Sequence, residues 1–459
     1  MPEPPDFLDP LSEMIALSAW GNTKNLIVTA IALNGPVDEH AITTATQKAA
    51  KHFPRMRSFL RELKGPLGRR LAWEAQPDLE FPVHISSLSS GHTSSPALDE
   101  FLNHLAPRLE RDRDLFHEPP GELHVLKTAS GTCTMGPIIH HAASDGVTAA
   151  EFGRQILLEY HALVTGEKHK AGSDVFVLSS SKRRMARPRA GAWKDLAFST
   201  VQSLIPYSPR IALPVGKGRP DNAGQHHIKR TLSAEASLRI LSAAPQKGVS
   251  FVDLLAACAD IAVDKWNDNR NVQPGTLTNS MTINMKGRYS GLDSPNAGGV
   301  LFFKTRPEMR TDIVSLAKVL SASRVKQLRK QLDFAYFTNV TRLANSFRML
   351  PFETRRRLVH FFVQKHRVSV GLTFLGTVWP KMKNGKPTAD TGLTEVGGLE
   401  ITDVHAIGYK LLSSTPLLII VYLFRNQINL VLAASASLLT RREGEDFLDL
   451  VIQLLLDTR

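Results

Sequence analysis

The chain has little cysteine and no hydrophobic run long enough to cross a membrane. Only two cysteines, Cys133 and Cys258, occur in 459 residues, so we expect no disulfide framework and a reducing compartment. The longest uninterrupted apolar run, Pro416–Phe424, is far shorter than the roughly 20 residues that span a bilayer. The acidic, proline-rich N-terminus lacks the basic and apolar regions of a secretory signal. These absences predict a cytoplasmic protein.

Several signatures of catalysis and binding are also missing from the sequence. There is no G-x-S-x-G elbow of a serine hydrolase and no phosphate-binding P-loop. Neither zinc-ligand spacing nor a helix-turn-helix pattern is found, and the basic clusters do not interleave with aromatic residues as in a nucleic-acid-binding module. We therefore expect no nucleic-acid partner and no bound metal.

What is present is an ordinary globular composition with an excess of positive charge. Hydrophobic residues make up 42% and charged residues 22%, and the net charge is +13. The residues from Ser321 to Arg367 include eleven basic and two acidic side chains, and Lys182–Arg189 holds five basic ones just before an apolar helical stripe at Trp193–Ile205. Two interpretations remain open. The clusters are solvated helix faces, or they bind coenzyme A, an acidic carrier protein or an anionic membrane surface in a peripheral manner.

The order of the apolar segments predicts an α/β protein with three parts. In residues 1–170, strand-like segments alternate with helical ones. Residues 171–225 are rich in Ser, Pro, Gly and basic side chains, which is typical of a linker or crossover that carries one amphipathic helix. Residues 226–459 begin a second set of strands and helices, with a hairpin expected to turn at Arg425, Asn426 and Gln427. The pattern predicts two sub-domains and a basic linker.

One segment, GPIIHHAASDGVTAAEF, places adjacent histidines at the end of a buried strand. Side chains alternate along a strand, so His140 and His141 should differ in role, one facing a cleft and the other packing inside. Histidine titrates at a pKa of about 6.5, which suits proton transfer at neutral pH. Asp145 is expected to fix the turn, through a hydrogen bond or an ion pair with an arginine. Gly146 is expected to allow a backbone conformation that a side chain would forbid.

Two further observations surround this motif. The spacing of Thr148 and Glu151 predicts a capping box for the helix that follows. A second doublet, His226 and His227, has Thr231 in place of the aspartate and no glycine after it, which indicates an ordinary strand start. Metal binding by His140 and His141 is not expected, because adjacent side chains on opposite faces do not converge on one ion.

The stretch HHAASDG resembles the HHxxxDG signature of the condensation-domain and chloramphenicol-acetyltransferase-like superfamily. The chain looks like its stand-alone members, the wax ester synthase/diacylglycerol acyltransferase-like and polyketide-associated acyltransferases. VSFVDLLAACADIAVDKW and NAGGVLFF resemble further family segments, so the likeness covers nearly the whole chain. It implies two chloramphenicol-acetyltransferase-like sub-domains in a V-shaped pseudo-dimer with a tunnel between them.

The resemblance also implies a reaction. His141 would act as the general base on an acceptor hydroxyl while an acyl thioester of coenzyme A or a carrier protein is attacked, with His140, Asp145 and Gly146 completing the site. No cofactor beyond this co-substrate is implied, and the acceptor would be a small molecule or a lipid. Amide formation in a peptide-synthetase-type pathway and a non-catalytic binding role remain alternatives. The chain departs from the family at Val252 and at Phe374, two positions where the wax-synthase-like group usually has asparagine.

Overall fold

The structure is a computed structural model of residues 1–459. It describes residues 6–19, 21–65, 68–88, 98–129, 131–167, 211–219, 221, 224–285, 296, 298–334, 339, 343, 345–365, 368–383, 386–411 and 415–458. Most of the expected linker, including its basic cluster and its amphipathic stripe, lies outside the described residues.

The first sheet contains six strands in the order β14-β15-β2-β7-β6-β5. Its members are β2 (Leu26–Asn34), β5 (Val83–Ser87), β6 (Gly121–Lys127), β7 (Cys133–His140), β14 (Glu395–Val396) and β15 (Leu399–Tyr409). The central strands β2 and β7 are apolar almost throughout because helices cover both faces of the sheet. α2 (Glu39–His52) and α4 (Gly146–Thr165) pack on one face, and α3 (Leu98–Glu110) packs on the other. The expected alternation of strands and helices in the first half is confirmed.

The second sheet also contains six strands, in the order β10-β9-β11-β16-β17-β8. They are β8 (Gln225–Thr231), β9 (Leu277–Asn284), β10 (Gly298–Thr305), β11 (Val370–Thr377), β16 (Leu417–Phe424) and β17 (Gln427–Ser435). One face packs against α6 (Ala234–Gln246), α7 (Phe251–Asp268), α8 (Ile313–Arg329) and α11 (Arg441–Leu456). The expected hairpin is confirmed: Arg425 and Asn426 both have positive φ, 49° and 59°, as a two-residue type I′ turn requires.

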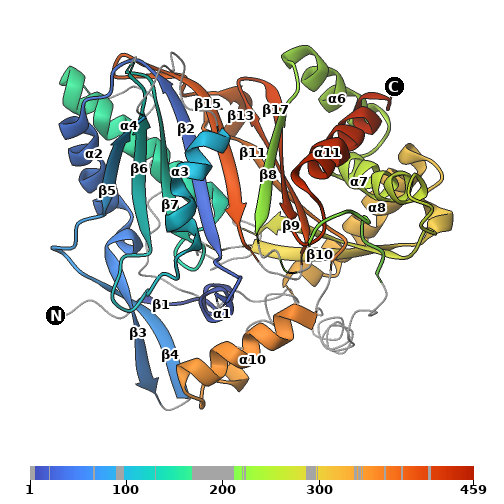
Figure 1. The fold of residues 1–459 in the computed structure, drawn as a ribbon, viewed down its shortest axis with the longest axis horizontal. Helices are drawn as coiled ribbons and strands as arrows, with labels where there is room; N and C mark the ends of the chain where they lie inside the picture. The colour runs from blue at the N-terminus through green and yellow to red at the C-terminus, as the bar shows by residue number, and fades with distance from the viewer. Residues whose placement is uncertain are drawn as a thin grey trace.

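The two sheets lie side by side in Figure 1, and the chain crosses between them. β15 lies between β11 and β16 of the second sheet in sequence but pairs with β2 of the first, from Tyr409 opposite Leu26 to Glu400 opposite Asn34. The expected division at residue 226 is therefore not a clean boundary, because β14 and β15 complete the first sheet. The architecture is the expected pair of α/β sub-domains.

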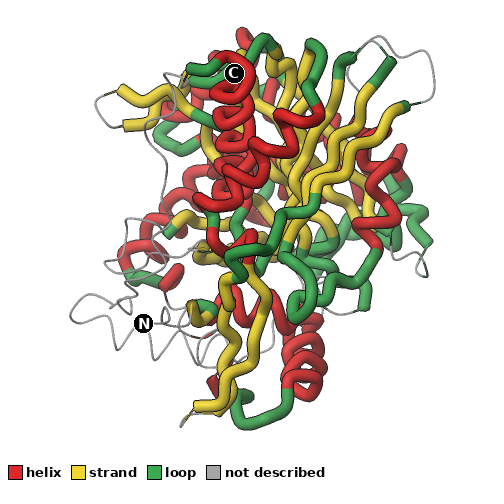
Figure 2. Tube along the Cα trace, turned by 90° about the vertical axis from the view of Figure 1, so that its left-hand side faces the viewer, coloured by secondary structure: helices red, strands yellow, loops and turns green. Residues whose placement is uncertain are grey.

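A smaller unit lies below the first sheet in Figures 1 and 2. It comprises β1 (Asp6–Phe7), α1 (Pro10–Ser18), β3 (Ser58–Gly65), β4 (Gly68–Ala75) and α10 (Phe352–Lys365). The fully buried Arg355 of α10 donates to Glu13 at 3.0 Å and to Glu62 at 2.5 Å. Arg356 donates to the carbonyl of Ala19 at 2.7 Å. Arg355 belongs to the basic cluster at Ser321–Arg367 but is neither solvated nor open to a partner, because its two glutamates, about 300 positions away, enclose its charge.

The remaining short elements are η1 (Pro54–Arg57), η3 (Pro307–Met309), β12 (Pro380–Lys383) and β13 (Lys386–Thr391). Across the described part of the chain, every helix is too short or too polar to cross a bilayer.

Candidate active site

The histidine pair lies where the central strand β7 ends between its two neighbours. The backbone N–H of His140 donates to the carbonyl of Pro120, just before β6, at 2.7 Å. The N–H of His141 donates to the carbonyl of Asn25, just before β2, also at 2.7 Å. Both residues are thus held by the first sheet. His140 is buried and His141 is half-buried, the contrast expected from alternation along the strand.

The side chain of His140 has a structural hydrogen bond. Its Nδ1 accepts from the backbone N–H of Ala142 at 3.1 Å, which means that the ring proton is on Nε2. Burial lowers the pKa of His140 to about 3, and the nearby positive charge of Arg113 acts in the same direction. At neutral pH His140 is therefore an uncharged ring that holds the turn after β7.

Asn296, from the segment between β9 and β10, determines the tautomer of His141. Its Nδ2 lies 2.6 Å from the carbonyl oxygen of His141, 3.3 Å from that of Ala142 and 2.9 Å from Oγ of Ser12. Carbonyl oxygens only accept, so this end of the amide must be the donor. Its Oδ1 is then the atom that lies 3.1 Å from Nδ1 of His141. Because Oδ1 can only accept, Nδ1 carries the proton and Nε2 keeps its lone pair.

This hydrogen bond joins the two halves of the molecule at the motif. Asn296 is almost fully buried, and Ser12 extends the network to Asp9, whose Oδ2 accepts from Oγ of Ser12 at 2.6 Å. Burial lowers the pKa of His141, while the charge of Asp145 and the bond to Asn296 raise it in part. A neutral ring with an unprotonated Nε2 is the form that accepts a proton. The sequence did not identify Asn296, which is one polar residue within the polar stretch GRYSGLDSPNAGG.

Asp145 and Gly146 are both near His141, but two of the local predictions are wrong. Asp145 is itself the N-cap of α4 and accepts from the N–H of Thr148 at 2.7 Å, so Thr148 does not begin the helix with a capping box to Glu151. Gly146 is the first residue of α4 and is not among the residues with positive φ. A Cβ there would lie 3.3 Å from Leu375 of β11. Close approach of β11, not backbone conformation, accounts for the glycine.

The two departures from the family pattern, at Val252 and Phe374, lie in different elements, α7 and β11. Asp253, beside Val252, forms a capping box with Ser250 and receives two hydrogen bonds of 2.8 Å from Arg324, which makes it a structural residue of α7. Phe374 lies one residue before Leu375, the contact of Gly146, and its ring packs edge-on against Phe251 at 5.7 Å. Its side chain is 37% exposed. The Phe374 ring therefore packs against the first residue of α7.

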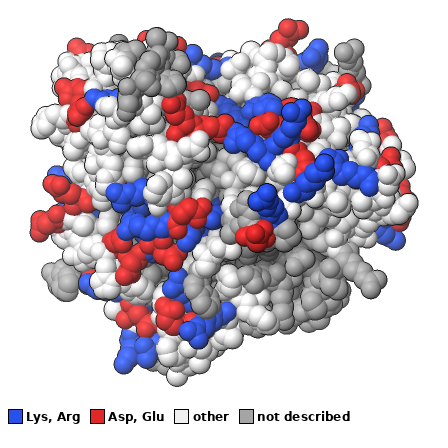
Figure 3. All heavy atoms as spheres, viewed as in Figure 1, with Lys and Arg blue, Asp and Glu red and all other residues white. Residues whose placement is uncertain are grey.

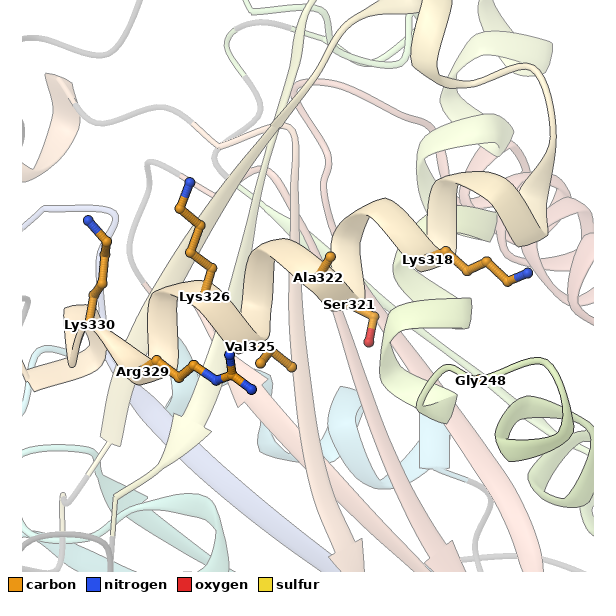
Figure 4. Close-up of a pocket in the computed structure, with 8 residues that line it drawn as sticks. All are labelled: Gly248, Lys318, Ser321, Ala322, Val325, Lys326, Arg329 and Lys330. Carbon is orange, nitrogen blue, oxygen red and sulfur yellow. The ribbon is translucent and has the colours of Figure 1, made fainter.

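Part of the basic excess lines an open groove of about 590 Å³ along α8. Lys318, Lys326, Arg329 and Lys330 project from this helix in Figure 4 and are exposed. Lys318, Lys326 and Arg329 form no ion pair with the described residues. On the face shown in Figure 3, most other basic side chains lie next to acidic ones. The α8 groove is thus one described surface that offers positive charge without a described ion-pair partner.

Comparison with known proteins gives results for structure only. Sequence comparison finds no matching family profile and no matching curated protein. Trichothecene 15-O-acetyltransferase TRI3 from Fusarium sporotrichioides superposes with a TM-score of 0.70 at 13% identity, over 99% of this chain and 95% of that one. The first condensation domain of the calcium-dependent antibiotic synthetase gives 0.67 at 14% identity, over 98% and 95%.

A third structure was solved with a ligand. It is the starter condensation domain of rhizomide synthetase, an arginine variant in complex with C8-CoA, with a TM-score of 0.65 at 14% identity over 98% of this chain and 93% of that one. Identities this low describe the fold and not the reaction. The curled sheets, the crossover of β15 and these superpositions over nearly the full length lead to one conclusion: the chain has the fold of the condensation-domain and chloramphenicol-acetyltransferase-like superfamily.

Proposed function

We propose that the protein is an acyltransferase that moves an acyl group from a thioester to an acceptor hydroxyl, with His141 as the general base. The observation that carries this proposal is the hydrogen bond from Nδ1 of His141 to Oδ1 of Asn296, which leaves the lone pair on Nε2. The fold supports it, since one protein of this fold is an O-acetyltransferase and another was solved with an acyl-CoA.

The proposed reaction needs one proton-transfer group. Nε2 of His141 accepts the hydroxyl proton as the acceptor oxygen attacks the thioester carbonyl. The tetrahedral intermediate then collapses, the carbon–sulfur bond breaks, and the thiolate takes the proton back from the ring. Asp145 and Asn296 stabilise the transient imidazolium, because both raise the pKa of His141. General base catalysis of this kind contributes about 10²- to 10⁴-fold.

Amide formation is the second candidate function. The same base can remove a proton from an attacking amine, and condensation domains share this fold. An alcohol acceptor gives an ester and an amine acceptor gives an amide, so assays with each acceptor distinguish the two candidate functions. The proposal also includes a substrate tunnel between the two sub-domains and a small-molecule or lipid acceptor.

The donor is proposed to be anionic, as coenzyme A and acidic carrier proteins both are. The unpaired charges of Lys326 and Arg329 in the α8 groove are the described residues best suited to meet it. Charge reversal at both positions should raise the KM for the acyl donor. The increase should be smaller at high salt, because exposed charges are screened. Peripheral binding to an anionic membrane rests on residues 182–205, outside the described part of the chain.

The decisive experiment measures free-thiol release from a panel of acyl-CoAs, first with alcohols and then with amines. His141→Ala should reduce turnover at least about a hundredfold, the low end of general base catalysis. The matched control is His227→Ala, which removes the second histidine of the other doublet, a buried ring whose pKa burial lowers to about 4. It should leave turnover per folded molecule unchanged. Nearly full activity of His141→Ala would contradict the mechanism, and no thiol release with any donor would favour a binding role.

A further inference from the structure

A cluster of two histidines and one glutamate lies on the face of the first sheet that α3 covers. His84 of β5 is paired in register with His124 of the adjacent strand β6. Glu122 precedes His124 by two residues and therefore shares its face. One ligand atom from each of the three residues lies within 4.8 Å of the other two. Within the described ranges, this is the one group of His, Cys, Asp or Glu side chains placed to hold a metal ion.

The donor atoms converge but do not satisfy one another. Nε2 of His84 lies 3.4 Å from Oε2 of Glu122, and Nε2 of His124 lies 3.4 Å from Oε1. Both Nε2 atoms are buried, and at this distance neither forms a well-shaped hydrogen bond with the carboxylate or with another described residue. The side chains of Glu122 and His124 are only 3% and 5% exposed. Buried polar atoms without partners are rare and costly in folded proteins, so these two nitrogens call for a ligand.

The spacing matches a tetrahedral ion. Zinc binds histidine nitrogen and carboxylate oxygen at about 2.0 to 2.1 Å, and a tetrahedron with such bonds holds its ligand atoms about 3.3 to 3.4 Å apart. The two nitrogen–oxygen separations have this length, with His84 facing Oε2 and His124 facing Oε1 of the carboxylate, and one ligand atom from each residue lies within 4.8 Å of the other two. The stacked rings of His84 and His124, with centroids 4.7 Å apart, direct both nitrogens to the same carboxylate.

Arg113 completes the surroundings of the cluster. Its Nη2 lies 2.9 Å from Oε1 of Glu122, and its Nη1 donates to the carbonyl of Pro119 at 3.2 Å. Ligating carboxylates are commonly held in this way, with one oxygen on an outer partner and the other on the metal. The positive charge of Arg113 also opposes a cation, and Arg108 adds to it more weakly. We expect micromolar affinity, weaker than that of structural zinc sites.

We propose that His84, Glu122 and His124 form a binding site for one Zn²⁺ ion, with the fourth position open to water. Two imidazole ligands favour zinc over magnesium or calcium, which prefer oxygen. The ion would tie the edge strand β5 to β6, close to the Pro120 carbonyl that holds His140. This site is separate from His141 and does not depend on the proposed reaction.

The test is titration of the untagged full-length chain with ZnCl₂, followed by calorimetry, and with CoCl₂, followed by visible absorption. The wild type should bind one Zn²⁺ per chain and melt at a higher temperature with it, and Co²⁺ should give the intense absorption of a tetrahedral site. His84→Ala and His124→Ala should each weaken zinc binding at least about a hundredfold, more than loss of an outer partner usually does. His117→Ala is the control, because His117 is 77% exposed and belongs to another pair.

The outcomes separate clearly. Loss of binding in both ligand variants with an unchanged His117 variant supports the site. Absence of zinc binding in the wild type, or full binding in both ligand variants, overturns it. If His124→Ala does not fold, His84→Ala decides the matter together with the wild-type cobalt spectrum, since His84 lies on an edge strand and is 35% exposed.

Discussion

Replacement of Asn296 by alanine tests the central feature of the site. The variant removes the acceptor of the Nδ1 proton of His141, and it removes the donor to the carbonyls of His141 and Ala142. The ring then loses the side-chain acceptor that holds its Nδ1 proton. A hydrogen bond of about 1 to 1.5 kcal/mol corresponds to about a tenfold preference between two states, so the ratio of the Nδ1–H tautomer of His141 to the Nε2–H tautomer should fall by about tenfold.

Two quantities should change. Turnover should fall about ten- to a hundredfold, from the lost tautomer preference and from poorer aim of the ring. The free energy of unfolding should fall by about 2 to 3 kcal/mol, because buried carbonyls lose their donor. The pKa of His141 should also fall, since the bond to Asn296 favours the charged ring. The acid limb of the pH profile of kcat/KM should therefore move to lower pH.

Asn296→Asp should shift the pKa of His141 in the opposite direction. A carboxylate beside Nδ1 favours the imidazolium, so the pKa of His141 should rise and the acid limb should move to higher pH. Asn279→Ala is the matched control. Asn279 is another almost fully buried asparagine, which donates to Asp260 at 2.5 Å in the second sheet. It should cost similar stability and leave the pH profile in place.

The pKa and the tautomer can be read without a substrate. Ring ¹⁵N shifts of labelled histidine distinguish the two tautomers, and the His141→Gln spectrum assigns the signal. A His141 that keeps its Nδ1 proton and its pKa in both Asn296 variants would refute the assignment, as would shifts of equal sign in the two variants.

Two further predictions concern single side chains. Asp145→Asn keeps an N-cap of nearly equal strength, so the melting temperature should stay almost unchanged. The acid limb of the pH profile of kcat/KM should move to lower pH, because the charge of Asp145 raises the pKa of His141. A large loss of stability on thermal unfolding would contradict this. Glu13→Gln should cost about 3 kcal/mol in urea unfolding, because Arg355 and Arg348 both lose a buried partner, whereas Glu353→Gln, at the exposed pair with Arg356, should cost less than about 1 kcal/mol.

The sequence predicted those elements whose cause is local. The buried strands β2, β7 and β16 are continuous apolar runs, and the turn at Arg425 and Asn426 follows directly from the two runs that flank it. The start of α4 was misplaced because Asp145 and Thr148 are both good caps, and only the backbone shows which one accepts.

The remaining features depend on partners distant in sequence. Arg355 looked like surface charge because Glu13 and Glu62 are about 300 residues away. Asn296 lies 155 positions from His141, and no periodicity links them. His84 and His124 meet through the register of two strands whose pairing follows from the fold. Long-range charge pairs and hydrogen bonds leave no local pattern to read.

The pairing of β15 with β2 has a consequence for synthesis of the chain. Leu26 has its neighbour Tyr409 only after 383 further residues have been made, which at about 5 to 20 residues per second takes roughly 20 to 80 seconds. During that interval one edge of β2, nine largely apolar residues, has no strand beside it. An unpaired apolar edge is a template for association with other chains. The nascent first half therefore needs protection from aggregation until the second half is nearly complete.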